Sequence, residues 1–357
     1  MTQTADTVVV GAGVIGLCAA TAIARRGRTV ILVGELRSGQ ASAAAAGMLA
    51  PSVERATGPA HRFAIAARDF YPGFLESLAD ATGMRVPLNR LGILQVALSE
   101  KGVRGLRGTA APHSQWLERS ELAEMEPALG HALGAVLNPD DGSVDNVLLV
   151  AALSELVNRT PLIRRLTGAV LRVSGSASSA SAELASGEIL EGEHVVLAPG
   201  AWGAAIEGAP ALHVVAPSRG QLVSFASVGL RHVTYGPRGY LVPRASGTTI
   251  AGSTMENVGF VSETTSEGIA KVRSAAEEIA PALSIAPMMA GWAGLRPVTP
   301  DMLPILGPDP DHPQIVYACG HSRNGILLAP LTGETVAEIV TGQAARHDLS
   351  QFRPGRF

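Results

Sequence analysis

Three glycines near the N-terminus have the spacing of a turn that binds phosphate. The segment GAGVIG places Gly11, Gly13 and Gly16 between a β-branched run at residues 7–10 and an alanine-rich helical stretch at residues 14–26. Gly11 permits a sharp turn, Gly13 lets the backbone approach a pyrophosphate, and Gly16 lets the helix pack closely on the strand. The helix N-terminus adds free N–H groups and the positive end of the helix dipole. The pattern therefore predicts a dinucleotide-binding site.

An acidic residue follows the second β-branched run of this unit, residues 29–33. At the end of that strand, dinucleotide-binding folds use a carboxylate to bind the ribose hydroxyls. Here the commonest position holds Gly34, and the acid, Glu35, comes one residue later. We expect Glu35 to hold the adenosine ribose, with a solvated turn carboxylate as the alternative.

Three segments with many small residues distinguish between a flavin and a nicotinamide cofactor. Residues 38–51, SGQASAAAAGMLAP, cannot build a core, but they let backbone press against a flat ligand. Residues 194–202, HVVLAPGAW, predict a buried strand that ends in a small-residue turn. Residues 316–328, VYACGHSRNGILL, predict a strand, a glycine turn and a helix that begins near Gly325 and faces the pyrimidine edge of a flavin. Such turns at the start, middle and end of one chain indicate one long cofactor, FAD, rather than NAD alone.

The elements that must position these turns predict an α/β fold. The succession of strand, glycine turn, helix and strand is typical of a Rossmann-like FAD-binding domain. Alternating apolar patterns predict strands of a second, largely antiparallel sheet over the flavin, at residues 92–98, 221–225 and 248–252. We expect an interleaved chain, with the FAD-binding domain in residues 1–80, 141–214 and 291–357 and the substrate-binding domain in residues 81–140 and 215–290. The serine-rich run at residues 174–181 predicts a hairpin tip.

Composition limits the other classes of function. The 357 residues carry a formal net charge of −3 and no basic cluster interleaved with aromatics, so nucleic acid is not an expected partner. Cys18 and Cys319 have neither CxxC nor Cys/His ligand spacing, which predicts reduced thiols and no metal site. No apolar run approaches the roughly 20 residues of a membrane span, and the N-terminus lacks a signal-peptide pattern. We expect a cytoplasmic protein without membrane association, and leave open whether it is a homo-oligomer.

Longer motifs cover nearly the whole chain and together identify a family. They are GAGVIGL from Gly11, SAAAAGMLAP from Ser42, DGSVDNVLLVAAL from Asp141, VVLAPGAW up to Trp202, PSRGQ from Pro217, YLVPR from Tyr240, GSTME from Gly252, GLRPVTPDMLPILG from Gly294 and GHSRNGILLAP from Gly320. With these motifs the chain resembles the D-amino-acid oxidase family of flavoproteins, and most closely its glycine oxidase branch. The resemblance implies FAD as the cofactor.

The resemblance also assigns roles to residues at matching positions. For the cofactor it implies Gly11, Gly13, Val14, Ile15, Gly16, Glu35, Ser42, Ala45, Ala46, Gly47, Met48, Val170, Gly200, Trp202, Gly325, Ile326 and Leu327. For the substrate it implies that Arg296 and Tyr240 bind the carboxylate, that Met255 forms a wall and that Arg323 is a second polar residue nearby. Sarcosine oxidases of the wider superfamily attach flavin through a cysteine before a TPD segment. Residues 291–298 hold no cysteine, so we expect non-covalent FAD.

The reaction that the resemblance implies is oxidative deamination of a small amino acid, most favourably glycine. A hydride passes from Cα to flavin N5, and O2 accepts the electrons to give hydrogen peroxide. The imine product then hydrolyses to an oxo acid and ammonia. No side-chain base stands out, because His61, His213, His232 and His321 are scattered without a paired carboxylate at useful spacing. Two alternatives stay open. One is a flavin oxidase or dehydrogenase of sarcosine, D-proline, hydroxyproline or D-alanine, and the other is a non-catalytic or NAD-binding Rossmann protein. With glycine as substrate, the resemblance would imply a role in thiamine biosynthesis.

Overall fold

A six-stranded sheet carries the N-terminal glycine turn. The computed structural model describes residues 2–54, 56–108 and 111–357. The strand order is β10-β3-β2-β14-β21-β20, parallel except for β20. Its elements are β2 (Thr7–Val10), β3 (Val30–Gly34), β10 (Ile163–Thr167), β14 (His194–Leu197), β20 (Ile305–Pro308) and β21 (Ile315–Cys319). The predicted strand, turn, helix and strand at the N-terminus are confirmed, with a helix that ends at Arg25.

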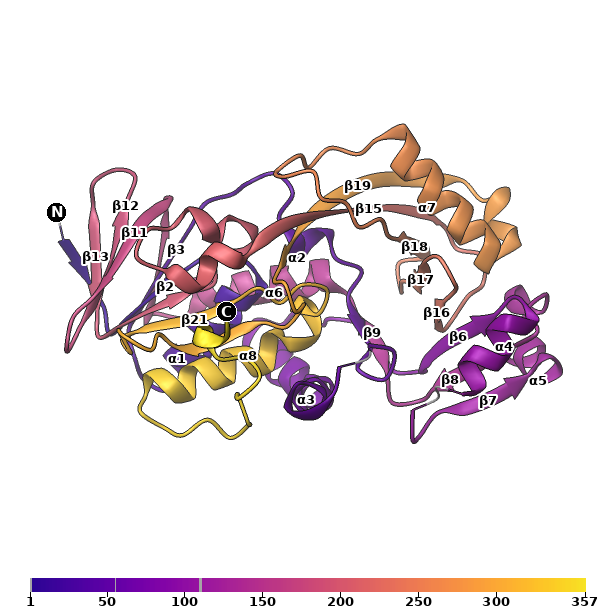
Figure 1. The fold of residues 1–357 in the computed structure, drawn as a ribbon, viewed down its shortest axis with the longest axis horizontal. Helices are drawn as coiled ribbons and strands as arrows, with labels where there is room; N and C mark the ends of the chain where they lie inside the picture. The colour runs from indigo at the N-terminus through magenta and orange to yellow at the C-terminus, as the bar shows by residue number, and fades with distance from the viewer. Residues whose placement is uncertain (1, 55, 109–110) are drawn as a thin grey trace.

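Different layers cover the two faces of this sheet, as its buried and largely apolar strands β2, β3, β14 and β21 require. Val9 and Leu32 pack among helices on one face, while Val8 and Ile31 pack against the other layer. The helices are α1 (Val14–Arg25), α3 (Gly58–Thr82), α6 (Asn146–Arg159) and α8 (Gly325–Val340). The other layer is a small sheet of β1 (Thr2–Thr4), β13 (Ile189–Gly192), β12 (Ala180–Leu184) and β11 (Val170–Gly175), with two 3-10 turns, η2 (Gly200–Ala205) and η3 (Pro210–Val214). Figure 1 shows this small sheet at the end of the molecule that carries the N-terminus.

An eight-stranded sheet forms the other half of the molecule (Figure 1). Its order is β19-β15-β18-β17-β16-β6-β8-β7, antiparallel except where β6 meets β16. Its elements are β6 (Ile93–Ala97), β7 (Gln115–Glu118), β8 (Gly134–Asn138), β15 (Ala216–Ala226), β16 (Val233–Tyr235), β17 (Tyr240–Pro243), β18 (Thr248–Gly252) and β19 (Met288–Val298), with helices α4 (Glu100–Arg107), α5 (Arg119–Met125) and α7 (Ser266–Ile279). The predicted strands at residues 92–98, 221–225 and 248–252 all lie in this sheet.

The two halves meet along β15 and β19, which pair with each other from Ala216 to Phe225. Residue 291, where we place the start of the third cofactor segment, falls inside β19. A three-stranded sheet of β4 (Met48–Leu49), β9 (Gly142–Val144) and β5 (Leu88–Asn89) ties the small-residue segment to the start of α6. The division of the chain into two interleaved domains stays a prediction.

The small-residue segment at 38–51 differs from expectation. It forms a short helix, α2 (Ala41–Ala44), and the strand β4, and Ala46 and Ala50 are 4% and 3% exposed in a cluster with Val233 and Val242. The prediction that this run builds no core is therefore wrong. Its side chains are small because the chain passes between the two large sheets.

No helix in the described residues is long and apolar enough to cross a membrane.

Candidate functional site

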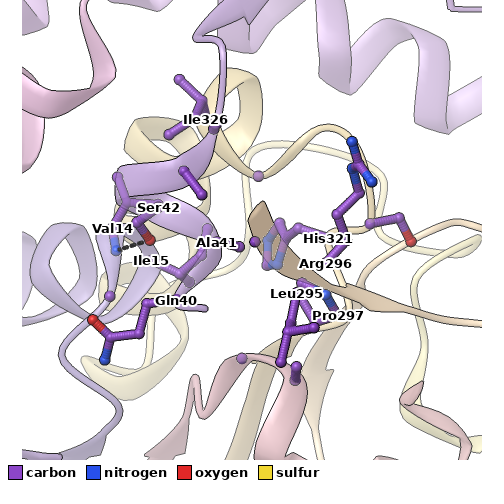
Figure 2. A pocket seen from close by; sticks show the side chains of 18 of the residues that line it. Val14, Ile15, Gln40, Ala41, Ser42, Leu295, Arg296, Pro297, His321 and Ile326 are labelled. Carbon is purple, nitrogen blue, oxygen red and sulfur yellow. Dashed lines mark hydrogen bonds between the residues drawn. The ribbon is translucent and has the colours of Figure 1, made fainter. Parts of the chain in front are cut away.

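A large cavity of about 540 Å³ lies where the sheets meet. Its wall is built from stretches far apart in the chain, including residues 10–15, 33–35, 44–48, 198–202 and 318–326. Figure 2 shows Val14, Ile15 and Ser42 on one side of it, with Arg296 and His321 across from them. Every position predicted from the resemblance lines this cavity except Gly16 and Leu327. The tertiary structure thus brings nearly all of the predicted site together.

The glycine turn at the start of α1 has no room for side chains. Gly11 has φ +106°, and a Cβ there would lie 2.1 Å from the carbonyl oxygen of Ala198. A Cβ on Gly16 would lie 1.7 Å from the carbonyl oxygen of Gly11, so Gly16 permits close packing behind the cavity wall. The first turn of α1 carries no acidic residue, and the Val14 N–H donates to Ser42 Oγ at 3.0 Å. The N-cap residue, Gly13, supplies no side-chain cap of its own, and a helix start without an acidic residue fits an anionic pyrophosphate.

A second helix also points its N-terminus at the cavity. Asn324, Gly325 and Ile326 line it, and the first turn of α8 again carries no acidic residue. Gly333 lets the helices α1 and α8 pack closely, because a Cβ at this position would lie only 2.6 Å from the backbone of Cys18. Leu327 is 1% exposed and packs in the core, so its side chain is not part of the wall. Two positive helix ends therefore face one ligand space.

The predicted ribose contact is present at the cavity, but it is not free. Glu35 accepts from Arg37 at 2.8 Å, and the Arg37 guanidinium lies 5.4 Å from the centre of the Trp202 ring. Trp202 stacks in turn on Phe260, with ring centres 6.1 Å apart. Arg37 and Phe260 were not predicted as site residues, because their contacts with Trp202 join distant parts of the chain. Glu35, Trp202 and Val170 all line the cavity.

At the other end of the cavity, Arg296 differs from the other arginines in the wall. Arg37 pairs with Glu35, Arg238 with Glu278 and Arg323 with Glu54. Within the described chain, Arg296 has no carboxylate partner and is held by two neutral acceptors. Its Nη1 donates to the Thr254 carbonyl at 3.2 Å, and its Nη2 donates to Ser253 Oγ at 2.7 Å. An unpaired guanidinium in a cavity is suited to bind a carboxylate through two parallel bonds.

Two glycines make room for the side chains of Arg296 and Tyr240. A Cβ on Gly220 would lie 2.2 Å from Arg296 Nη1, and one on Gly252 would lie 2.4 Å from the Tyr240 hydroxyl. Tyr240 also lies beside Tyr235, with ring centres 5.6 Å apart. The predictions for Arg296 and Tyr240 are consistent with these positions at the cavity. Gly220 and Gly252 were not predicted as site residues, although both lie in motifs that carry the resemblance.

The substitution Gly220→Ala is expected to raise KM for the substrate about tenfold or more without loss of cofactor. The new methyl group meets the mobile end of Arg296 rather than backbone, so the guanidinium moves and the fold persists. A displacement of about 1 Å in a binding group can cost up to about 100-fold in rate. Steady-state kinetics and the flavin absorbance of the purified variant test this. An unchanged KM would contradict it.

A buried polar cluster holds the segment that supports Arg296. Arg219 donates to Glu256 at 2.6 Å, and Gln221 donates to both oxygens of the same carboxylate. The Gln221 N–H donates to Thr254 Oγ1 at 2.9 Å. Burial raises the pKa of Glu256, but the bonds from Gln221 and Arg219 outweigh it and hold that pKa below its ordinary value. The segment is therefore fixed by charge and backbone pairing together.

Arg323 and Met255 are less enclosed. Arg323 Nη2 lies 2.9 Å from Glu54 Oε1, and the two side chains are 46% and 22% exposed. Met255 lines the cavity, and it is 55% exposed. Glu54 was not predicted, since nothing in its local sequence distinguishes it from a solvated acid. Both predicted residues belong to the wall at its open side.

Only one of the four singled-out histidines lines the cavity. His321 is 2% exposed, its Nε2 lies 3.1 Å from Thr332 Oγ1, and burial lowers its pKa to about 3. His232 is different, because its Nδ1 lies 2.5 Å from Glu126 Oε1 in a buried pair. The expectation that no histidine has a carboxylate partner is therefore wrong for His232. Neither residue of that pair lines the cavity, so the pair is structural.

Below pH 6.5, His321 is expected to make stability depend on pH. Its folded pKa of about 3 lies below the unfolded value of 6.5, so between them only the unfolded state binds the proton. Stability is therefore unaffected above pH 6.5 and is lost as pH falls. Relative to His321→Gln, the wild type should lose at most about 1.4 kcal/mol per pH unit. Urea unfolding of both proteins at several pH values measures this, and parallel curves would contradict it.

The glycine turn, the two helix starts and the unpaired Arg296 surround one cavity beside a Rossmann-like sheet. These features define an oxidoreductase that binds a flavin dinucleotide. A family model described as FAD dependent oxidoreductase, DAO, matches residues 6–339. The chain belongs to this DAO family, and FAD is its cofactor. The small residues of the cavity wall and the two helix starts that face it suit that group.

Known proteins are similar to this chain over its full length. The protein "Glycine oxidase" of Geobacillus kaustophilus is 34% identical over 99% of this chain and 97% of its own length. A crystal structure of glycine oxidase from the same organism superposes with a TM-score of 0.91, at 31% identity and 99% of both chains. "Bifunctional protein ThiO/ThiG" of a Nostoc species is 34% identical over 99% of this chain. The chain spans only 55% of that protein's length.

Proposed function

We propose that this protein oxidises the C–N bond of a small amino acid, most favourably glycine, with FAD and O2. The unpaired Arg296 guanidinium carries the proposal, because it lies in the same cavity as the cradle for the dinucleotide. The name of the similar Geobacillus protein, glycine oxidase, supports the substrate. Water would hydrolyse the imine formed by the oxidation, and the products would be an oxo acid, ammonia and hydrogen peroxide.

Arg296 and Tyr240 would fix the substrate by its carboxylate. The guanidinium supplies two charge-assisted bonds, and the Tyr240 hydroxyl, which has no hydrogen-bond partner in the described chain, is available to donate a third. Both side chains lie against glycines, so the carboxylate can approach them closely. With this end held, the Cα hydrogen takes one orientation in the cavity. Bound FAD would supply the acceptor for the hydride and the route by which the electrons reach O2.

The substrate amine must be neutral for its Cα to give up a hydride. The positive charge of Arg296 disfavours the ammonium form and lowers the pKa of the bound amine. No side-chain base is required for this step. His321 is the histidine in the wall, and its burial holds its pKa at about 3, so it is a poor proton acceptor. We infer that the amine loses its proton to water.

FAD is proposed to be held without a covalent bond. Residues 291–298 hold no cysteine, and Cys319 is the cysteine that lines the cavity. Its thiol donates to the Gly200 carbonyl at 3.3 Å, and burial raises its pKa to about 12. A thiol that stays protonated is a poor nucleophile. Acid precipitation should therefore release all the flavin into solution.

An aerobic screen for peroxide tests the proposed activity. The purified holoenzyme is offered glycine, sarcosine, D-alanine, D-proline and hydroxyproline, and glycine should give the highest kcat/KM. Reduction of the flavin without peroxide would instead show a dehydrogenase. A higher rate with a secondary or D-amino acid would replace glycine by that substrate. A protein that binds no flavin, or one whose flavin none of these amines reduces, would contradict the proposal.

The setting of the activity is also a proposal. The similarity to the Nostoc protein named ThiO/ThiG supports a role in thiamine biosynthesis, with the oxidised product of glycine as the intermediate. The two cysteines are free and buried, which is compatible with the reducing cytoplasm. Growth of a gene-deletion strain without thiamine tests the role in thiamine biosynthesis. Cell fractionation tests the cytoplasmic location. Gel filtration with light scattering tests whether the chain forms a homo-oligomer.

A further inference from the structure

The charged groups around the cavity leave one uncompensated positive charge. The guanidinium groups of Arg37, Arg238 and Arg323 each lie against a carboxylate, at 2.8, 2.6 and 2.9 Å. His321 is buried and uncharged at neutral pH. Arg296 alone keeps its charge without an acidic partner in the described chain. One guanidinium without an acidic partner matches a ligand that carries one carboxylate and a neutral amine.

The pair of Glu54 and Arg323 lies at the substrate end of the cavity. Both side chains line the wall, as do Tyr235 and Tyr240, whose rings are 5.6 Å apart. Tyr235 is partly buried, and desolvation first and the nearby Glu54 second raise the pKa of its hydroxyl. Glu54 and Arg323 therefore face the region next to the carboxylate-binding Tyr240. They come from opposite ends of the chain and meet only in the fold.

We propose that Glu54 determines substrate specificity by occupying the second guanidinium of the site. With Arg323 engaged, a second carboxylate on the substrate finds no free positive charge and meets the Glu54 anion instead. Like charges brought together in a partly enclosed site repel each other, whereas a single carboxylate at Arg296 is not affected. The inference rests on the proposed function and adds to it which amino acids are excluded. Dicarboxylic amines are the excluded class.

The substitution Glu54→Gln tests this because it removes the negative charge and keeps the shape. It leaves Arg323 free to bind a second carboxylate, as an unpaired guanidinium prefers to do. Binding of acetate and of malonate to the holoenzyme is measured from the change in flavin absorbance, which requires no turnover. The ratio of the malonate Kd to the acetate Kd should fall about tenfold in Glu54→Gln. The ratio of kcat/KM for iminodiacetate to that for glycine should rise by a similar factor.

Two controls separate this effect from a general change of charge. Glu277→Gln frees Arg273, which pairs with it at 2.7 Å on α7 and does not line the cavity, so the ratios should stay at their wild-type values. The double variant Glu54→Gln with Arg323→Gln should lose the gain in malonate binding. If the double variant keeps the gain, Arg323 is not its source and the proposal is wrong.

The outcomes also separate this inference from the proposed function. Suppose that acetate binds the wild type and Glu54→Gln equally well while the ratio of the malonate Kd to the acetate Kd does not change. In that case the specificity role of Glu54 is wrong and the proposed function stands. If acetate does not bind the wild type and glycine is not oxidised, both are wrong. A wild type that already binds malonate more tightly than acetate would also overturn the role of Glu54.

Discussion

Arg296→Ala should raise KM for glycine by about 100-fold or more while FAD stays bound. Arg296 is the unpaired guanidinium of the cavity, and a bidentate bond to a carboxylate involves two charge-assisted hydrogen bonds. Hydrogen bonds to charged groups contribute about 1.5–3 kcal/mol each, so loss of both costs about 3 kcal/mol or more. The charge that keeps the amine neutral is lost as well. Kinetics at saturating oxygen measure KM for glycine, and the flavin spectrum shows whether FAD stays bound.

Two variants act as controls for Arg296→Ala. Arg296→Lys keeps the positive charge but not the planar guanidinium. Its KM for glycine should therefore lie between those of the wild type and the alanine variant. Arg273→Ala removes an exposed arginine of α7 and should leave KM unchanged. An Arg296→Ala enzyme with normal KM would show that the carboxylate is bound elsewhere.

Gly11→Ala should abolish binding of FAD and destabilise the fold by several kcal/mol. The backbone at Gly11 has φ +106°, which alanine rarely adopts, and the new Cβ would lie 2.1 Å from the carbonyl oxygen of Ala198. That oxygen belongs to the backbone at the end of β14, so the turn must open. Strain of this kind costs about 1–3 kcal/mol from the backbone alone. The flavin content of the purified protein and its urea unfolding curve measure the result.

Gly73→Ala is the matched control for this change. Gly73 lies within α3, where a Cβ would meet no atom within 4 Å. Alanine favours helix over glycine by about 1 kcal/mol, so this variant should bind FAD normally and be slightly more stable. If Gly11→Ala behaves like Gly73→Ala, the phosphate turn does not have the geometry described above.

Local pattern predicted the nucleotide end of the molecule closely. The strand at Thr7–Val10 has the predicted bounds, and α8 begins at Gly325 as expected. These elements are determined by neighbours in the chain, since a β-branched run, a glycine turn and a helical stretch each specify their own backbone. Residues named from the resemblance also gather at one cavity, because the motifs occupy the ends of those elements.

Contacts between distant segments could not be predicted in this way. Glu54 and Arg323 are 269 positions apart, and so are not related by any local spacing. His232 and Glu126 meet in a buried pair that the sequence analysis missed. Ala46 and Ala50 belong to a core cluster although their segment was expected to contribute none. In each case the partner comes from a distant part of the chain.

The sequence alone determined which backbone turns can hold a dinucleotide, because glycine conformation and helix starts depend on neighbouring residues. The tertiary structure decided which arginine is free to bind a substrate. All four arginines of the cavity carry the same charge, and only the placement of Glu35, Glu54 and Glu278 distinguishes Arg296 from the rest. Electrostatic pairing acts over a few ångströms in space, whereas Arg238 and Arg323 are 40 and 269 positions from their carboxylates in the chain. The order of residues does not contain the distances that join them.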